Sequence, residues 1–374
     1  MKLFLVAGEA SGDTRGAELM RALLARAPTL TFLGAGGPQM RALAGGALLD
    51  WADEAVVGLW DVLKKYGYFR ARFAQMLDEI AASKPAALIL IDYPGFNLRL
   101  AKAARARHPG MKIIYYISPQ VWAWHRERIP QMARMLDLML CIFPFEKPLY
   151  EQSGLRTEFV GHPMLDSLPA KRIAAPRDEH LVVLLPGSRG KEVRKIFPTM
   201  LATARRMRDE RPDLRFETSA ASPVLAAQMR TALAAGGLDE TFCAVHTGTA
   251  HELMQRAVAG IVCSGTATLE AAYFGLPMCI IYKVAWLTWV VGRRLVRVDF
   301  LGMPNLLAGR EIVREFLQDA ARPEPMAMEM LRLAGDAGAR EAVQRELAAV
   351  IEKLGEPGAG IRAATCIVAE LGIP

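Results

Sequence analysis

The sequence predicts an α/β protein built from two Rossmann-like domains whose parallel sheets face each other across a cleft. Apolar strand-like runs alternate with helical patterns along the whole chain, as in proteins with parallel sheets. Near the N-terminus, the run KLFLV (2–6) leads into a glycine-bearing turn and then into a helical pattern. The run LVVLL (181–185) leads into the turn PGSRG in the same way. Because such turns aim backbone N–H groups and a helix N-terminus at one point, each copy predicts an anion site.

Length and proline pattern divide the chain. A sequence of 374 residues is long enough for two domains. The stretch 161–176 contains three prolines and predicts a linker. We therefore expect an N-terminal domain over 1–165, a C-terminal domain over 166–340 and a helical tail over 341–374.

The individual elements follow from the apolar patterns. The expected strands are 2–6, 31–33, 86–91, 112–117, 138–142 and 157–160 in the first half, and 181–185, 215–218, 242–246, 259–263 and 278–282 in the second. Helices are expected after residues 12, 66, 97, 127 and 145, and over 195–208, 226–234, 250–256, 268–274, 341–354 and 358–371.

Composition restricts the class of protein. Hydrophobic residues make up 52% of the chain, yet no apolar run reaches the roughly 18 residues of a membrane span. The N-terminal apolar run is short, and Glu9 and Asp13 follow it, which favours a buried strand over a signal peptide. The five cysteines contain no C-x-x-C pair and are expected to be reduced core residues. We therefore expect a cytoplasmic protein.

The charge balance favours anionic partners. The formal net charge is +7 and the pI is about 9.2. Such a chain suits phosphorylated substrates or an anionic membrane surface, although surface solubility is an alternative explanation. Nucleic acid is not expected, because the charges are dispersed and no helix-turn-helix, RNP or zinc-finger pattern is present.

The turn after the expected strand 259–263 is a candidate nucleotide site. Gly265 lets a ligand approach the backbone, and the hydroxyls of Ser264, Thr266 and Thr268 are possible hydrogen-bond donors. Glu270, near the first helical turn, could accept hydrogen bonds from ribose hydroxyls. The alternative is an ordinary helix N-terminus, where a carboxylate is favoured by the dipole.

The turn after strand 181–185 is a candidate diphosphate site. Arg189 directly follows Gly187 and Ser188, and a guanidinium pairs bidentately with phosphate oxygens. The turn has neither the Walker spacing nor the G-x-G-x-x-G spacing of dehydrogenases, so a dehydrogenase is disfavoured.

A carboxylate at the end of strand 86–91 is the first candidate for a catalytic base. Asp92 occupies the position where open α/β sheets place functional groups. Asp13 and Glu9 are rival candidates, and Asp92 as a simple turn former before Pro94 and Gly95 is the structural alternative.

The segment PQVWAWH, 119–125, gathers aromatic and imidazole groups after a strand. Trp122 and Trp124 could stack on a sugar or line an apolar slot, or could simply pack between domains. His125 and His162 could titrate near neutral pH, although a lone histidine is more often structural.

Two segments combine large apolar groups with cations. The first, 59–72, contains Trp60, Leu63, Tyr66 and Phe69 among basic residues and fits either an anionic bilayer surface or the rim of an acyl pocket. The second runs from Trp286 to Val298 and includes Trp289, Arg293, Arg294 and Arg297. A buried helix with basic edges is the alternative for both.

Taken together, these motifs resemble those of the lipid-A-disaccharide synthase family, and the likeness spans nearly the whole chain. Nine motifs in this order carry it: AGEASGD (7–13), GGPQM (36–40), IDYPGFN (91–97), SPQVWAW (118–124), FPFE (143–146), VGHP (160–163), LPGSR (185–189), SGTATLE (264–270) and PNLLAG (304–309).

The resemblance implies a GT-B glycosyltransferase of lipid A biosynthesis in a Gram-negative bacterium. The implied substrates are UDP-2,3-diacylglucosamine and 2,3-diacylglucosamine 1-phosphate, and the implied location is the cytoplasmic side of the inner membrane. The family's essential aspartate corresponds to Asp92, and its nucleotide contacts to Arg189, Glu270 and Asn305. Ser11 and Gly12 would face the cleft from the acceptor side. The tail 341–374 would cross back to the first domain, and a homodimer is compatible with this resemblance.

We expect an inverting reaction in which Asp92, or else His125, takes a proton from the acceptor hydroxyl. No metal or cofactor is expected, since the sequence offers no Asp-x-Asp motif. The alternatives are another UDP-sugar transferase or epimerase with the same fold, or a non-catalytic lipid- or nucleotide-binding protein.

Overall fold

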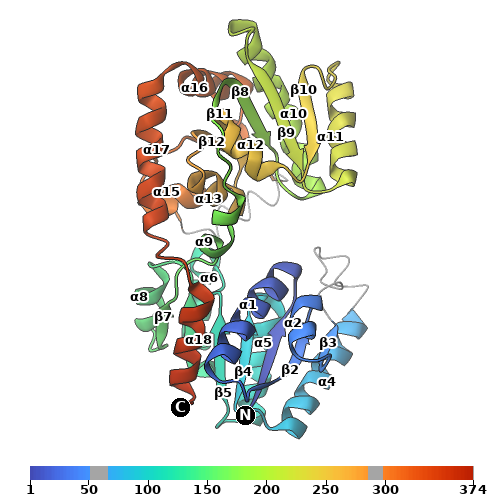
Figure 1. The fold of residues 1–374 in the computed structure, drawn as a ribbon, viewed down its shortest axis with the longest axis vertical. Helices are drawn as coiled ribbons and strands as arrows, with labels where there is room; N and C mark the ends of the chain where they lie inside the picture. Colours follow the sequence, from blue (N-terminus) through green and yellow to red (C-terminus); the bar gives the residue numbers. More distant parts are fainter. Residues whose placement is uncertain (51–65, 285–297, 374) are drawn as a thin grey trace. The chain divides into compact units, whose positions relative to one another are not determined.

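The computed structural model describes residues 1–50, 66–284 and 298–373, which form two compact units (Figure 1). The first unit contains Met1–Asp166 and Leu354–Pro374, and the second contains Ser167–Lys353. Each unit is built on its own parallel sheet, so the predicted α/β class with two Rossmann-like sheets is confirmed.

The sheet of the first unit has seven parallel strands in the order β3-β2-β1-β4-β5-β6-β7. The chain adds strands to one side of β1 and then returns to add β4 on the other side, so the strand order reverses between β1 and β4. Ligand sites of open α/β sheets lie at such a switch point. The strands are β1 (Lys2–Ala7), β2 (Thr31–Gly36), β3 (Leu48–Asp50), β4 (Ala87–Ile91), β5 (Lys112–Tyr116), β6 (Leu138–Cys141) and β7 (Thr157–Phe159).

Helices cover this sheet and bury its two central strands, β1 and β4, almost completely. Such continuous burial explains why both strands read as unbroken apolar runs. The helices are α1 (Ala10–Arg26), α2 (Pro38–Leu43), α4 (Tyr66–Ser83), α5 (Pro94–Arg107), α6 (Val121–Trp124), η2 (Arg126–Arg128), α7 (Ile129–Met135), α8 (Glu146–Glu151) and α9 (Met164–Ser167), the last of which spans the unit boundary.

The end of the chain belongs to the first unit only from Leu354 onward. Helix α18 (Ala359–Glu370) packs against α1 (Figure 1). Lys112 and Arg156 both donate to the carboxylate of Glu370, at 2.7 and 2.6 Å. Helix α17 (Ala337–Glu352) instead packs against α13 and α16 of the second unit. The expected tail of 341–374 is therefore divided between the two units.

The sheet of the second unit has six parallel strands in the order β10-β9-β8-β11-β12-β13. Its strand order reverses between β8 and β11, which are hydrogen-bonded neighbours. The carboxyl ends of these two strands therefore lie side by side. The strands are β8 (Asp178–Leu185), β9 (Arg215–Ala220), β10 (Cys243–Thr247), β11 (Ala257–Cys263), β12 (Met278–Tyr282) and β13 (Glu315–Leu317).

The helices of the second unit form two groups. Helix α10 packs against α11 and α16, while α13 packs against α15 and α17. Their apolar faces are buried, as Phe197 and Met200 of α10 show. The elements are η3 (Pro169–Lys171), α10 (Gly190–Glu210), α11 (Pro223–Ala235), α12 (Ala250–Arg256), α13 (Thr266–Tyr273), α15 (Met303–Ala308), η4 (Gln318–Ala320) and α16 (Pro323–Gly335).

Across the ranges that the structure describes, no helix combines the length and the apolar character needed to cross a bilayer. All five cysteines are free, and four of them are buried.

Candidate functional site

Two turns meet at the switch point of the second unit. One follows β8 and leads into α10, and the other follows β11 and leads into α13. A side chain placed on Gly187 would approach the sulfur of Cys263 to 3.4 Å, so the first turn lies against the end of β11. The first N–H groups of a helix have no partner within the helix. The two turns therefore present two helix N-termini at one edge of the sheet, an arrangement that suits an anion.

Arg189 is held at this edge by the start of its own helix. Its backbone N–H donates to Glu192 at 3.3 Å, and its guanidinium donates to the same carboxylate at 3.1 Å. Gly187 has a φ of +106°, and any side chain there would lie 2.5 Å from Glu192. The Arg189 side chain is 66% exposed, and an ion pair this exposed contributes only about 0–1 kcal/mol. The guanidinium is therefore available to a phosphate group.

In the turn 264–268, some groups are accessible to a ligand and others are already hydrogen-bonded within the protein. Gly265 has a φ of +147°, and no described atom lies within 4 Å of the position that a side chain would take. Thr266 is exposed at the first turn of α13. Ser264 donates to the carbonyl of Leu301 at 2.8 Å. Thr268 is fully buried and donates to the carbonyl of Gly265 at 2.7 Å, so its hydroxyl supports the turn and does not face a ligand.

Glu270 lies one turn further along α13 and is 33% exposed. Its carboxylate lies 3.2 Å from the Nε2 atom of His251 on α12, and the His251 ring packs against Phe274. His251 therefore orients Glu270. The sequence analysis missed His251, because no motif marks it and the contact joins two separate helices.

The structure corrects the nucleotide-binding role expected for Asn305. This side chain is completely buried and uses both of its polar atoms within the protein. Its amide donates to Val313 and Glu315 at 2.7 and 2.8 Å, and its oxygen accepts from the N–H groups of Ile312 and Val313. Asn305 ties α15 to the strand β13 and has no group left for a nucleotide.

In the first unit, Asp92 lies at the carboxyl end of β4 in a left-handed backbone conformation, with φ of +48°. Such a conformation in a residue other than glycine costs on the order of 1–3 kcal/mol. Two buried side chains stabilise it by donating to the Asp92 carbonyl, Asn97 at 2.7 Å and the Tyr115 hydroxyl at 2.5 Å. The sequence analysis assigned no role to either donor.

The environment raises the pKa of the Asp92 carboxyl above its usual value. Burial is the main cause, and the nearby charge of Glu9 adds to it, while a hydrogen bond from the Tyr93 N–H acts in the opposite direction. A carboxylate with a raised pKa binds protons more strongly than an ordinary aspartate, which suits a general base.

The turn after β1 lies beside Asp92 at the switch point. A side chain on Gly8 would lie 2.3 Å from the ring of Tyr93, so only glycine lets the ring pack on this turn. Ser11 is exposed on the first turn of α1, and Gly12 is buried against Ala7. The structure thus brings the Ser11–Gly12 turn and Asp92 to one edge of the sheet.

The structure assigns Asp13 a structural position and not the catalytic one that was expected. Its side chain is only 2% exposed. One carboxylate oxygen accepts from the N–H of Gln39 at 3.0 Å, and the other accepts from the N–H of Met40 at 2.9 Å. Both N–H groups belong to the start of α2, so Asp13 caps that helix.

His125 and His162 lie in contrasting environments. His125 is exposed at the end of α6, with its Nδ1 atom 2.8 Å from Glu127. Burial lowers the pKa of His162 to about 4, and its Nδ1 atom accepts from the N–H of Met164. The lowered pKa favours the neutral form of His162 near pH 7, and its Nδ1 atom holds the start of α9.

A buried carboxylate fixes the loop that carries His125. Glu146 accepts from the Ser118 hydroxyl at 2.5 Å, the Trp122 indole at 2.8 Å and the Phe143 N–H at 3.1 Å. Burial raises its pKa to about 7. Trp122 is consequently a core residue, whereas Trp124 is 51% exposed. The sequence analysis assigned no role to Glu146, because nothing in the local pattern shows that it is buried.

The expected membrane contacts fall largely outside the described part of the chain. Trp60 and Leu63 belong to the range 51–65, and the second segment overlaps the range 285–297, neither of which the structure describes. Tyr66 and Phe69 lie in helix α4, but their side chains are likewise not described.

Comparison with known proteins assigns the family. The family model of lipid-A-disaccharide synthetase matches residues 3–365. The lipid-A-disaccharide synthase of Geobacter sulfurreducens is 43% identical over 382 aligned residues, which cover 99% of this chain and 97% of the relative.

The chain belongs to the lipid-A-disaccharide synthetase family. The predicted family is confirmed, and with it the prediction of a glycosyltransferase of lipid A disaccharide synthesis. The GT-B fold is also supported by solved structures. S. aureus MnaA, solved with UDP, is 13% identical with a TM-score of 0.64, covering 100% of this chain and 97% of that one. The calicheamicin glycosyltransferase CalG4 is 14% identical with a TM-score of 0.57, covering 100% and 98%.

The substitution Asp13→Ala tests whether this residue supports the fold or takes part in the chemistry. We expect the free energy of unfolding to fall by about 1–2 kcal/mol, because two N–H groups at the start of α2 lose their acceptor. Denaturant titration measures this change. Glu9→Gln, an exposed carboxylate on the same turn, is the matched control and should leave stability unchanged. Full stability of the Asp13 variant together with complete loss of turnover would instead make Asp13 catalytic.

Proposed function

We propose that the chain transfers the diacylglucosamine unit of UDP-2,3-diacylglucosamine to 2,3-diacylglucosamine 1-phosphate. The products are UDP and a β-1′,6-linked disaccharide 1-phosphate. Family membership supports this reaction. The single structural observation that carries it is the strained, half-buried Asp92, whose raised pKa suits a base that accepts a proton from a sugar hydroxyl.

The switch point of the second unit is our proposed site for the UDP moiety. The N-termini of α10 and α13 favour the diphosphate, and Arg189 exchanges its weak surface ion pair for a phosphate oxygen. Glu270, oriented by His251, accepts hydrogen bonds from the ribose hydroxyls. Because negative charge grows on the leaving UDP, these fixed positive groups stabilise the transition state more than the ground state.

The proposed reaction proceeds by one displacement. The donor sugar is α-linked to UDP and the product is β-linked, so configuration inverts and no covalent enzyme intermediate is required. Asp92 takes the proton from the acceptor 6-hydroxyl as its oxygen attacks the anomeric carbon. A positioned base of this kind contributes on the order of 10²–10⁴-fold to the rate. Asp92 is preferred to His125 because its backbone is locked by two hydrogen bonds, whereas His125 is exposed and paired with Glu127.

We also propose that the protein works as a peripheral enzyme on the cytoplasmic surface of the inner membrane. Both proposed substrates carry acyl chains, which hold them in a bilayer. The net charge of +7 favours an anionic surface. The segment 59–72, with Trp60 and Tyr66, is the proposed contact with the bilayer.

The alternative activities lack comparable support. A UDP-sugar epimerase or a transferase acting on a soluble acceptor needs no acylated partner. Likeness to solved structures below 25% identity indicates the fold only, whereas the 43% identical relative is a lipid-A-disaccharide synthase.

Asp92→Asn tests the proposed chemistry directly. Purified protein is incubated with the two acylated substrates, and the disaccharide is measured by mass spectrometry. We expect turnover to fall by about 10²–10⁴-fold while UDP affinity is retained, because the base is lost and the nucleotide site is unchanged. Arg189→Gln is the complementary control and should weaken UDP binding. Near-normal turnover of the Asp92 variant would remove Asp92 as the base, and no disaccharide from the wild type would contradict the proposed function.

Trp60→Ala combined with Tyr66→Ala tests the membrane contact. The double variant should bind anionic vesicles more weakly, because two interfacial aromatic groups are lost, while its thermal unfolding stays unchanged. Vesicle sedimentation measures the binding. Wild-type binding in the double variant would discard this segment as the docking surface.

A further inference from the structure

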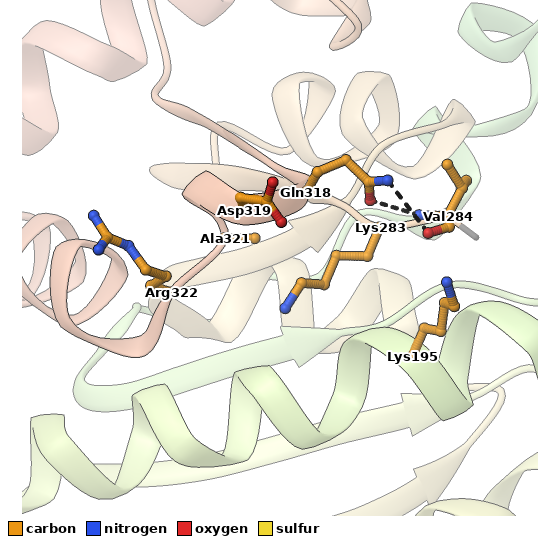
Figure 2. A pocket seen from close by; sticks show the side chains of 7 residues that line it. All are labelled: Lys195, Lys283, Val284, Gln318, Asp319, Ala321 and Arg322. Carbon is orange, nitrogen blue, oxygen red and sulfur yellow. Dashed lines mark hydrogen bonds between the residues drawn. The ribbon is translucent and has the colours of Figure 1, made fainter. Parts of the chain in front are cut away.

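A cavity of about 480 Å³ lies in the second unit, apart from the two turns proposed for the nucleotide. It is formed between helix α10, the end of β12 and the turn η4 that leads into α16. Figure 2 shows the Lys283 side chain extended between the Gln318–Asp319 turn and the helix that carries Lys195. The described residues that line it are Lys195, Lys283, Val284, Gln318, Asp319, Ala321 and Arg322.

The lining of this cavity is cationic. Among the described residues, the lining contains three cations, Lys195, Lys283 and Arg322, and one carboxylate, Asp319, which is an excess of two positive charges. Among the described residues, none of the three cations forms a salt bridge with a carboxylate. Burial lowers the pKa of the Lys283 ammonium, Asp319 opposes this effect, and Lys195 adds to it. A bound anion would relieve the repulsion between the two lysines.

Hydrogen bonds within the protein fix side chains that line the cavity. The Lys283 ammonium donates to the Thr199 hydroxyl on α10 at 2.9 Å. Gln318 has a φ of +48°, a left-handed conformation unusual for its residue type, and its amide bonds both the N–H and the carbonyl of Val284. These contacts join the ends of β12 and β13, so the lysine is positioned by the surrounding structure and does not move freely on the surface.

The cavity and the proposed diphosphate site lie at different positions along helix α10. Glu192, which pairs with Arg189, and Thr199, which holds Lys283, lie two turns apart on α10. At 1.5 Å per residue the separation along the helix is about 10 Å. Lys195, which also lines the cavity, lies one turn from Glu192, so the cavity begins beside the diphosphate turn and extends away from it along α10. None of its described lining residues belongs to that turn or to the turn 264–268.

We propose that this cavity is a second anion site that binds a phosphomonoester, separate from the nucleotide diphosphate. A phosphomonoester carries between about 1.5 and 2 negative charges at neutral pH, which matches the excess charge of the lining better than a carboxylate or a phosphodiester. The lysines supply compact ammonium donors, and the exposed Arg322 adds a third positive charge to the lining. The volume exceeds that of a phosphate group alone and lies in the range of ordinary ligand pockets, so it accepts the group to which the phosphate is attached.

Titration calorimetry with the full chain tests the proposal. Glucosamine 1-phosphate is the soluble probe, and vesicles of phosphatidylcholine with or without phosphatidic acid are the lipid probe, all in the presence of saturating UDP. Binding of the soluble probe alone assigns a free phosphomonoester, and binding of the phosphatidic acid vesicles alone assigns a lipid headgroup. Either result supports the site if the cavity variants lose it.

The variants are Lys283→Gln and Lys195→Gln. Each should weaken phosphomonoester binding by about tenfold, because a charge-assisted contact is lost, while UDP affinity stays unchanged. Lys171→Gln, an exposed lysine of the same unit outside the cavity, is the matched control, and Lys283→Arg should restore most of the binding. Lys195 is exposed, so its variant reports on the site even if the Lys283 variant fails to fold.

Three results would overturn the proposal: no binding of either probe by the wild type, equal affinity in the wild type and the lysine variants, or displacement of the phosphomonoester by UDP. Because these measurements need neither acylated donor nor turnover, their failure is distinct from failure of the proposed transfer reaction.

Discussion

The conformation of Asp92 is the constraint on which the first half of the proposed site depends. An aspartate with positive φ is unfavourable, and here the cost is offset by hydrogen bonds from Asn97 and Tyr115 to its carbonyl oxygen. These bonds fix the carboxylate at the carboxyl end of β4 without using its oxygens. Burial and the charge of Glu9 then raise its pKa. Position and proton affinity thus arise from the same small group of contacts.

Both units place their candidate groups at a reversal of strand order, but the chemistry of those groups differs. In each sheet the strand order reverses between two neighbouring central strands, and the turns that follow them lie side by side. In the second unit these turns carry Arg189 and two helix N-termini, which favour an anion. In the first unit the corresponding edge carries Asp92, whose burial, assisted by the nearby charge of Glu9, raises its pKa and favours a bound proton. The fold supplies the positions, and a few side chains determine what each position binds.

The sequence predicted the long, strongly patterned elements and the strand ends that carry the candidate site. It missed β3 and β13, which are only three residues long, and the helix α16, which begins among prolines. It also expected Asp13 as a rival catalytic base and Asn305 as a nucleotide contact, although both bind backbone groups inside the protein. A motif identifies the residue at a turn but not the partner that the side chain finds. That partner comes from elements far away in the sequence, as with Asp13 and α2 or Glu146 and Trp122.

The most direct measurement of the central claim is the pH dependence of kcat/KM for disaccharide formation, in the wild type and in Glu9→Gln. An ionised Asp92 is required, so activity should fall as the pH drops through its raised pKa, with a midpoint above the roughly 3.9 of an ordinary aspartate. Glu9→Gln removes a neighbouring negative charge and should move this acid limb to lower pH while activity at high pH is kept. A wild-type acid limb at or below the value of an ordinary aspartate, or an inactive Glu9→Gln enzyme, would contradict the assignment of Asp92 as the base.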